Sequence, residues 1–263
     1  MSNDAAYAVG GLLNAFSSLM QLAVFDLDHT LMPLDTGELW VRWLLRESGR
    51  DPRFSVSEIE RFTREYRAGV LDINEFVDFQ LNFLASFKRN FLEKARAAYK
   101  ETIVRPNVPE SSRRLVQMHK DAGHVTAICT TTYSFVTQTA ADIFGVDALL
   151  ATRPQEGPDG EFTGKIDGTA SFGPGKVVWL KNFIRQQQAM MGRAFDRIWF
   201  YSDSMADRPL FEYVESKGGV NTVVNGEAKL IELAGSRGYF KITTFAESDL
   251  EFVRRIQQSL IGA

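Results

Sequence analysis

Residues 22–30 read LAVFDLDHT, a short apolar run followed by two carboxylates, Asp26 and Asp28, two positions apart. A continuous apolar run of this length is typical of a strand buried on both faces of a parallel sheet. In such sheets ligands bind at the carboxyl ends of the strands, where the chain turns toward the next helix. The sequence therefore predicts that Asp26 and Asp28 lie at the functional edge of a sheet.

Further apolar runs that end in polar residues follow along the chain, and amphipathic segments separate the later ones. Strands that alternate with helices indicate an α/β fold with a doubly wound parallel sheet. The predicted strands are residues 22–25, 125–129, 148–151, 198–201 and 220–224, and the predicted helices are residues 109–122, 133–144, 174–191, 205–216 and 226–236.

The alternation is interrupted between the first two strands. Asp26 and Thr130 are 104 positions apart, whereas a crossover between parallel strands needs only about 30 residues. The intervening segment lacks strand-like alternation and contains helix-capping patterns. Its predicted helices are residues 36–47, residues 57–68 begun by Ser57-x-x-Glu60, and residues 72–99 begun by Asp72-x-x-Glu75. The predicted units are an α/β core (20–35 and 106–263), an all-helical cap (36–105) and an N-terminal extension (1–19).

Several local features lie outside this alternation. Residues 152–171 are rich in Gly and Pro and predict a hairpin, and residues 245–260 predict a closing helix. His119 and His124 flank a helix end and are expected at the surface. Phenylalanines at helical spacing predict one apolar stripe along the helix at 72–99, and core packing is favoured over a ligand-binding wall. The stripe consists of Phe76, Phe79, Phe83, Phe87 and Phe91.

The composition is that of a soluble globular chain. Of 263 residues, 44% are hydrophobic and 24% are charged, which is enough for a packed core, and the formal net charge is −3. The lack of a concentrated Lys/Arg block argues against nucleic-acid and anionic-membrane partners. A single cysteine, Cys129, excludes an internal disulfide. The chain has no membrane-length apolar run and no basic secretory leader, so we expect a cytoplasmic protein. Nothing in the sequence specifies an oligomeric state.

Polar groups at other strand and helix ends extend the predicted site. Thr130 begins a run of three threonines after the second strand, where hydroxyl and backbone N–H groups suit phosphate oxygens. Lys176 begins a helix after a Gly-Pro-Gly turn, and Asp203 and Asp207 follow another strand. Carboxylates beside a phosphate site are the hard oxygen ligands that Mg²⁺ prefers.

These residues match, in order and context, the four motifs of the haloacid dehalogenase-like superfamily. The matching elements are Asp26-x-Asp28-x-Thr30, then Thr130, then Lys176, then Asp203-x-x-x-Asp207. The resemblance covers roughly residues 20 to 235 and is closest to the phosphoserine-phosphatase-like branch, whose helical cap is inserted between the first two motifs. It implies a Mg²⁺-dependent phosphatase acting on a small phosphorylated metabolite.

The resemblance implies a role for each motif residue. Asp26 would be the nucleophile that forms an aspartyl-phosphate, and Asp28 would be the general acid and then the general base. Thr130 and Lys176 would bind the transferring phosphoryl oxygens. Mg²⁺ would lie between the Asp26 carboxylate, the Asp28 backbone carbonyl and Asp203. Asp207 would lie near the same ion.

The substrate-binding residues have two interpretations. Asp35 matches the family position that contacts the substrate's amine, yet Asp35-Thr36-Gly37-Glu38 is also a capping box for the next helix. Thr131, Thr132 and Tyr133 follow the second strand and are expected to bind the substrate. If Gly69 aligns with the family's cap glycine, the arginine that holds the carboxylate of phosphoserine falls near Asp78. This departure argues against phosphoserine, and an amine without a carboxylate, as in histidinol phosphate, would suit the acidic residues better.

Two other functions use the same residues. A phosphotransferase would pass the aspartyl-phosphate to a second alcohol, although Asp28 favours hydrolysis because transferring pumps of the superfamily carry Thr at that position. A non-catalytic phospho-aspartate or binding module would also gather Asp, Thr and Lys. Receiver modules are about half this length and lack a helical insert.

Overall fold

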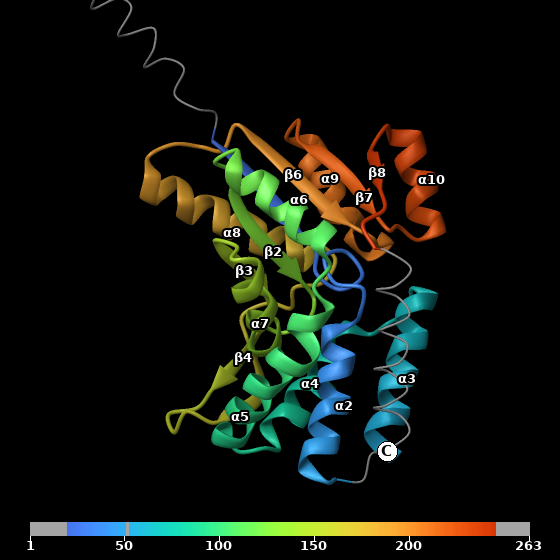
Figure 1. Ribbon diagram of the computed structural model, residues 1–263, viewed down its shortest axis with the longest axis vertical. Coiled ribbons are helices and arrows are strands. Elements are labelled where there is room, and N and C mark those ends of the chain that lie inside the picture. Colours follow the sequence, from blue (N-terminus) through green and yellow to red (C-terminus); the bar gives the residue numbers. More distant parts are fainter. Residues whose placement is uncertain (1–19, 51–52, 246–263) are drawn as a thin grey trace, which may run out of the picture.

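The computed structural model describes residues 20–50 and 53–245 of the chain. One parallel sheet is present, as predicted, and it has six strands in the order β3-β2-β1-β6-β7-β8 (Figure 1). No helix within the described ranges is long and apolar enough to cross a membrane. The strands are β1 Gln21–Phe25, β2 Val125–Thr130, β3 Ala148–Ala151, β6 Arg197–Ser202, β7 Val220–Val224 and β8 Phe240–Ile242. The sequence did not predict β8, and the helix predicted at 245–260 and the extension at 1–19 lie almost entirely outside the described residues.

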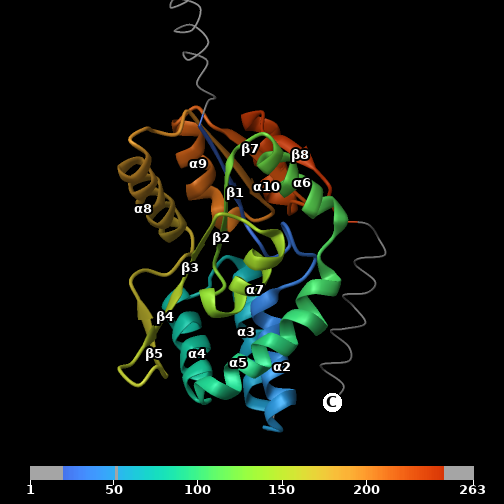
Figure 2. The ribbon, with the colours of Figure 1, turned by 60° about the vertical axis from the view of Figure 1, so that its left-hand side comes forward.

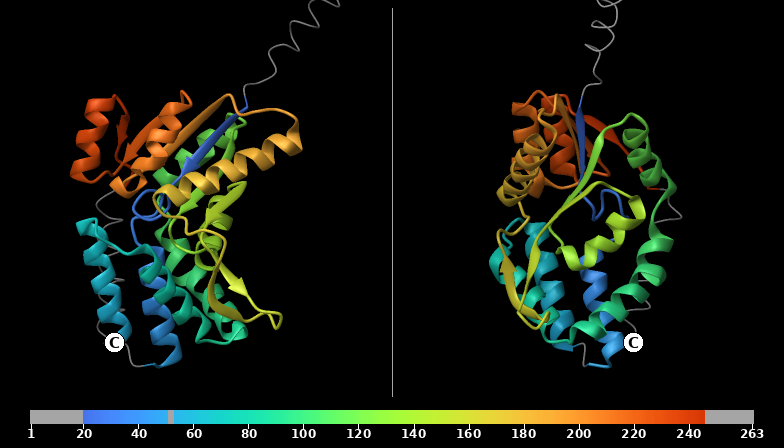
Figure 3. Two further views of the ribbon diagram at one scale, coloured as in Figure 1. Left: turned by 180° about the vertical axis from the view of Figure 1, so that it is seen from behind. Right: turned by 90° about the vertical axis from the view of Figure 1, so that its left-hand side faces the viewer.

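Strand β1 is in the centre of the sheet, between β2 and β6. Because successive side chains of a strand point to opposite faces, Leu22 and Val24 pack against α8, α9 and α10, whereas Ala23 and Phe25 join the cluster that contains α6 and α7. Figure 3 shows α8 and α6 on opposite sides of the sheet. These helices are α6 Glu110–Asp121, α7 Ser134–Phe144, α8 Pro174–Met191, α9 Arg208–Ser216 and α10 Ala228–Arg237.

The first four helices after β1 are gathered at the carboxyl ends of the strands, and α6 then leads into β2 (Figure 1). They are α2 Thr36–Ser48, α3 Arg53–Ala68, α4 Ile73–Ala85 and α5 Arg89–Tyr99. We call this group the helical region. It shares one apolar cluster with the core, in which the Trp40 ring contacts the rings of Tyr99 and Phe135 edge-on. The helical region therefore covers the edge of the sheet where Asp26 and Asp28 were expected.

The prediction of one long helix over residues 72–99 was wrong, because the chain turns between α4 and α5. The Ser86 hydroxyl donates to the carbonyl of Phe83, which competes with helical pairing. Arg50 then donates to both the hydroxyl and the carbonyl of Ser86. Phe87 stays buried at the turn and contacts the rings of Phe83 and Phe91. The aromatic stripe therefore continues from α4 through the turn into α5, and it packs in the core as predicted.

Two other local predictions meet different outcomes. Helix α3 begins at Arg53, so Ser57 lies inside the helix and does not cap it; Pro52, directly before Arg53 in the sequence, favours an earlier start. The hairpin expected within 152–171 is present as β4 Arg153–Glu156 and β5 Phe162–Asp167. It lies beside α4, with which β5 makes extensive contact (Figure 2).

His119 is buried behind the sheet, against the expectation of a surface position. Its side chain is 3% exposed and lies between the rings of Phe25, Tyr201 and Trp199. Its Nε2 is 2.7 Å from the Tyr201 hydroxyl, and its Nδ1 is 2.8 Å from Nδ1 of His124. Two partners for its two ring nitrogens explain why a histidine is tolerated in this apolar cluster.

This histidine predicts that acid destabilises the fold. Burial, with a smaller effect of His124, lowers the pKa of His119 from 6.5 to about 4. Between these values the unfolded chain binds a proton that the folded chain does not, so stability is lost as the pH falls through this window. We expect the free energy of unfolding to fall by about 2 kcal/mol more in the wild type than in His119→Gln over this range. Denaturant titrations at several pH values measure this difference, and parallel curves for the two proteins would contradict it.

Candidate active site

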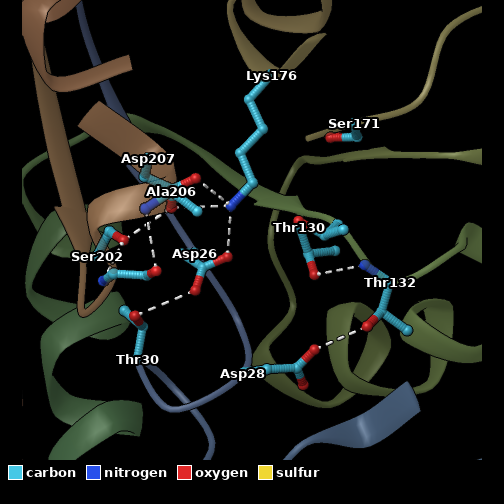
Figure 4. Close-up of polar contacts among 12 residues, drawn as sticks. Asp26, Asp28, Thr30, Thr130, Thr132, Ser171, Lys176, Ser202, Ala206 and Asp207 are labelled. Carbon is cyan, nitrogen blue, oxygen red and sulfur yellow. Dashed lines mark hydrogen bonds and ion pairs between the residues drawn. The ribbon is translucent and has the colours of Figure 1, made fainter. Parts of the chain in front are cut away.

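Asp26 directly follows β1 and is paired with a lysine from the far half of the chain. Lys176 Nζ lies 2.8 Å from Asp26 Oδ1, and the Thr30 hydroxyl lies 3.2 Å from Asp26 Oδ2 (Figure 4). Both members of the ion pair are buried, Asp26 at 7% and Lys176 at 2% exposure. The backbone N–H of Asp26 donates to Tyr201 in β6, which continues the sheet pairing to this residue. The carboxylate therefore has a fixed position at the centre of the sheet edge.

The first turn of α8 carries Lys176 into this edge. A Cβ on the preceding residue, Gly175, would overlap the carbonyl oxygen of Ala170, so only glycine allows this approach. Lys176 Nζ also lies 2.8 Å from Asp207 Oδ1. Burial alone would lower the pKa of Lys176, but Asp207 and Asp26 raise it well above its ordinary value. The ammonium therefore stays charged. Figure 4 shows it between the carboxylates of Asp26 and Asp207.

Asp203 and Asp207 lie where β6 ends. Asp203 Oδ1 accepts from the Thr30 hydroxyl at 3.0 Å, so the same hydroxyl lies between Asp203 and Asp26. Burial, followed by the charges of Asp26 and Asp207, raises the pKa of Asp203 well above its ordinary value. Asp207 accepts from Lys176 and from the Ser202 hydroxyl, the latter at 2.7 Å. The predicted helix at 205–216 begins as a 3₁₀ turn, Met205–Asp207, which places this carboxylate beneath the lysine.

The donor set at this edge fits Mg²⁺. Asp26 and Asp207 are buried and Asp203 is half-buried, and only one ammonium, that of Lys176, pairs with Asp26 and Asp207. The charges of Asp26 and Asp207 add to the burial that raises the pKa of Asp203. Within residues 20–50 and 53–245, no three Asp, Glu, His or Cys side chains form a metal site by themselves. Mg²⁺ is usually held by one or two carboxylates with water and substrate phosphate. Asp26 and Asp203, joined through Thr30, supply such a pair.

Asp28 is two residues beyond Asp26 but has a separate environment. Its Oδ1 accepts from the backbone N–H and the hydroxyl of Thr36, at 2.8 and 2.7 Å, and its Oδ2 accepts from the Thr132 hydroxyl at 2.8 Å. Burial, then the charge of Asp35, raises its pKa to about 8, although the Thr36 hydrogen bonds oppose this shift. The two carboxylates thus have different partners, and the Asp28 side chain points away from Lys176 (Figure 4).

The remaining predicted residues are placed as follows. Asp35 caps α2, because its Oδ1 accepts from the backbone N–H of Glu38 at 2.7 Å. Thr130 is buried next to the ion pair, and its Oγ1 accepts from the backbone N–H of Thr132. Thr131 is half-buried in the same turn. Tyr133 is 1% exposed and belongs to the apolar cluster, so the structure does not bring its side chain to the site, against the expectation that it binds the substrate.

Sequence reasoning missed the partners that orient the acids. Thr36 was noticed only as part of a capping pattern, and Ser202 was not singled out at all. The signal for Thr36 was its place next to Asp35, at the junction between the first motif and the helical region. Its contact with Asp28 depends on how the chain folds back over eight positions, which a spacing alone does not specify.

Residues 23–212 match the haloacid dehalogenase-like hydrolases. The chain belongs to this family. A histidinol-phosphatase from Neisseria meningitidis is 30% identical over 221 residues, which are 84% of this chain and 97% of that protein. A phosphoserine phosphatase from Mycobacterium tuberculosis is 32% identical over 139 residues, 53% of this chain and 42% of that protein.

A solved structure shares the fold of this chain. A protein of unknown function from Bordetella pertussis is 35% identical, has a TM-score of 0.78, and is matched over 87% of this chain and 100% of its own. The haloacid dehalogenase-like fold and the phosphoserine-phosphatase-like branch are therefore confirmed, and so is the prediction that this member of the family is a phosphatase.

Proposed function

We propose that this chain is a Mg²⁺-dependent phosphomonoesterase that hydrolyses a small phosphorylated metabolite through an aspartyl-phosphate on Asp26. The observation that carries this proposal is the pairing of a buried Asp26 with Lys176 at 2.8 Å, beside a second carboxyl, Asp28, whose surroundings raise its pKa to about 8. Two carboxyl groups with different protonation can divide the work of nucleophile and acid.

In the first step an Asp26 oxygen attacks phosphorus, a P–O bond to Asp26 forms, and the bond to the leaving alcohol breaks. The approach of a phosphate anion to a carboxylate needs positive charge nearby, and Lys176 supplies one at hydrogen-bonding distance. Thr130, buried in the same edge, offers its hydroxyl to the transferring group. Asp28, protonated near neutral pH, gives its proton to the leaving oxygen.

In the second step the deprotonated Asp28 accepts a proton from a water molecule that attacks phosphorus, and the bond to Asp26 breaks. Hydrogen bonds from Thr36 and Thr132 hold the Asp28 carboxyl in one orientation throughout. Both threonine hydroxyls can rotate to donate to the carboxylate or accept from the acid. The same side chain therefore serves both steps without a change of partners.

Mg²⁺, held by Asp26 and Asp203, would neutralise phosphate charge when bound. Chelation with EDTA should therefore reduce the hydrolysis of an aryl phosphate to background, and added Mg²⁺ should restore it. The thermal unfolding midpoint, measured alongside, should stay within a few degrees because the carboxylate that pairs with Lys176 remains in place. Full activity after thorough chelation would contradict the metal assignment.

The leaving group that the site fits best is an alcohol that carries a cationic amine. Asp35 is close enough to raise the pKa of Asp28 by its charge, and its cap to α2 uses only Oδ1. The histidinol-phosphatase relative supports the same substrate class. A panel of phosphomonoesters assayed with Mg²⁺ tests this: histidinol phosphate and similar amines should give a higher kcat/KM than phosphoserine. A preference for substrates without an amine would contradict it.

A further inference from the structure

Tyr66, in the last turn of α3, reaches from the helical region to the core. Its hydroxyl lies 2.7 Å from Oγ of Ser204, and its ring meets the ring of Phe172 edge-on with a centroid distance of 6.4 Å. Ser204 directly follows Asp203, and Phe172 lies four positions before Lys176. One side chain of the helical region thus contacts both loops that carry the charged groups of the site.

Tyr66 lies just before the C-terminus of α3. Helix α3 ends in a paired C-cap, in which Gly69 N–H donates to Tyr66 O and Val70 N–H donates to Glu65 O, each at 3.0 Å, with Gly69 at a φ of 73°. Arg61, one turn earlier, pairs with Glu65 of its own helix at 2.9 Å. The contacts of the C-cap define the end of α3, two residues beyond Tyr66. In Figure 1, α3 runs toward the sheet.

On the core side, Ser204 orients the turn that carries Asp207. Its Oγ accepts from the backbone N–H of Ala206 and so caps the 3₁₀ turn Met205–Asp207. Burial raises the pKa of Tyr66; the Ser204 hydrogen bond opposes this, and Asp207, Asp26 and Asp203 add to it. The phenol stays neutral, so it adds no charge near the carboxylates, and Tyr66 remains 42% exposed beside its contacts with Ser204 and Phe172.

We propose that Tyr66 is a positioning residue that fastens the helical region over the bound phosphoryl group through its contacts with Ser204 and Phe172. This inference rests on the proposed phosphatase chemistry, since a phosphoryl group on Asp26 would lie next to the two loops that Tyr66 contacts. The contact raises the affinity for phosphate by favouring the closed arrangement of the helical region. Release of phosphate then requires the Tyr66–Ser204 hydrogen bond to break.

Calorimetric titration with inorganic phosphate and Mg²⁺ tests this without relying on turnover. Tyr66→Phe keeps the ring and removes the hydroxyl, and we expect its Kd for phosphate to rise about fivefold, the effect of one net hydrogen bond. Tyr239→Phe is the matched control, because the Tyr239 hydroxyl also donates one hydrogen bond, to Glu215 at 3.0 Å, outside the site. Its Kd should equal that of the wild type.

A double-mutant cycle assigns the effect to the pair. Ser204→Ala also removes the hydrogen bond that caps the turn at Ala206, so its Kd for phosphate should rise more than that of Tyr66→Phe. Adding Tyr66→Phe to Ser204→Ala should raise the Kd little further. The inference would be overturned if the fold-changes in Kd of the two single variants multiplied fully in the double variant, or if Tyr66→Phe bound phosphate like the wild type. Neither result would affect the proposed hydrolysis. Tight, Tyr66-dependent phosphate binding without hydrolysis of any monoester would instead overturn the proposed function alone. A wild type that binds no phosphate would overturn both.

Discussion

Replacing Asp26 with Asn should lower kcat for an aryl phosphate by about 10⁴-fold or more, the scale seen when a covalent nucleophile is removed. The amide cannot form the aspartyl-phosphate, and no neighbouring group can take over, since Asp28 is turned toward Thr36 and Thr132 and Asp207 is held by Lys176 and Ser202. Steady-state release of phosphate measures the loss.

The same variant should remain folded. The site holds three carboxylates against one ammonium, so removing one negative charge relieves repulsion with Asp203 and Asp207, and Lys176 keeps its contact with Asp207. We expect an unfolding midpoint equal to or above that of the wild type. Asp121→Asn, which changes an exposed carboxylate at the end of α6, is the matched control and should be fully active. Activity of Asp26→Asn within tenfold of the wild type would refute the role of nucleophile.

Replacing Asp28 with Asn should separate the two chemical steps. An aryl leaving group departs without needing a strong acid, so Asp26 can still be phosphorylated. The attacking water has lost its base, however, and the rate of the second step should fall by about 10²–10⁴-fold. Rapid mixing should show a burst of phenol equal to the enzyme concentration, followed by slow turnover. The quenched protein should carry one phosphoryl group on the peptide that contains Asp26.

This variant needs a control for geometry, because Asp28 is held by three hydrogen bonds. The amide oxygen of the Asp28→Asn side chain can still accept from Thr36, so the position of the side chain should be kept. Thr132→Val removes one of these hydrogen bonds and leaves the carboxyl itself. It should slow both steps moderately and should not accumulate phosphoenzyme. Wild-type steady-state turnover by Asp28→Asn, with no burst, would show that Asp28 is neither acid nor base.

Much of the sheet and of its functional edge could be predicted from sequence. Five apolar runs predicted the strands of the parallel sheet other than β8 to within one residue at each end, since buried strands leave a strong local signal. Asp26 and Lys176 are 150 positions apart, yet they meet because β1 ends, and α8 begins, at the same edge of the sheet. Position in an α/β topology is thus enough to gather side chains that the sequence separates.

The parts that were missed depend on tertiary contacts. Helices α4 and α5 were predicted as one helix because Phe87 continues the apolar spacing through the turn, and the capping of Ser86 by Arg50 comes from outside both helices. His119 was expected at the surface because its partner, the Tyr201 hydroxyl, lies 82 positions away. The contact of Tyr66 with Ser204 spans 138 positions and has no local pattern at all.

The stereochemical course at phosphorus tests most directly whether Asp26 forms a covalent intermediate. The wild-type enzyme would hydrolyse a phosphate monoester made chiral with oxygen isotopes, in isotopically labelled water, and the configuration of the released phosphate would be determined. Two successive in-line displacements, first by Asp26 and then by water, predict overall retention. Inversion would show that water attacks the substrate directly and would contradict the account.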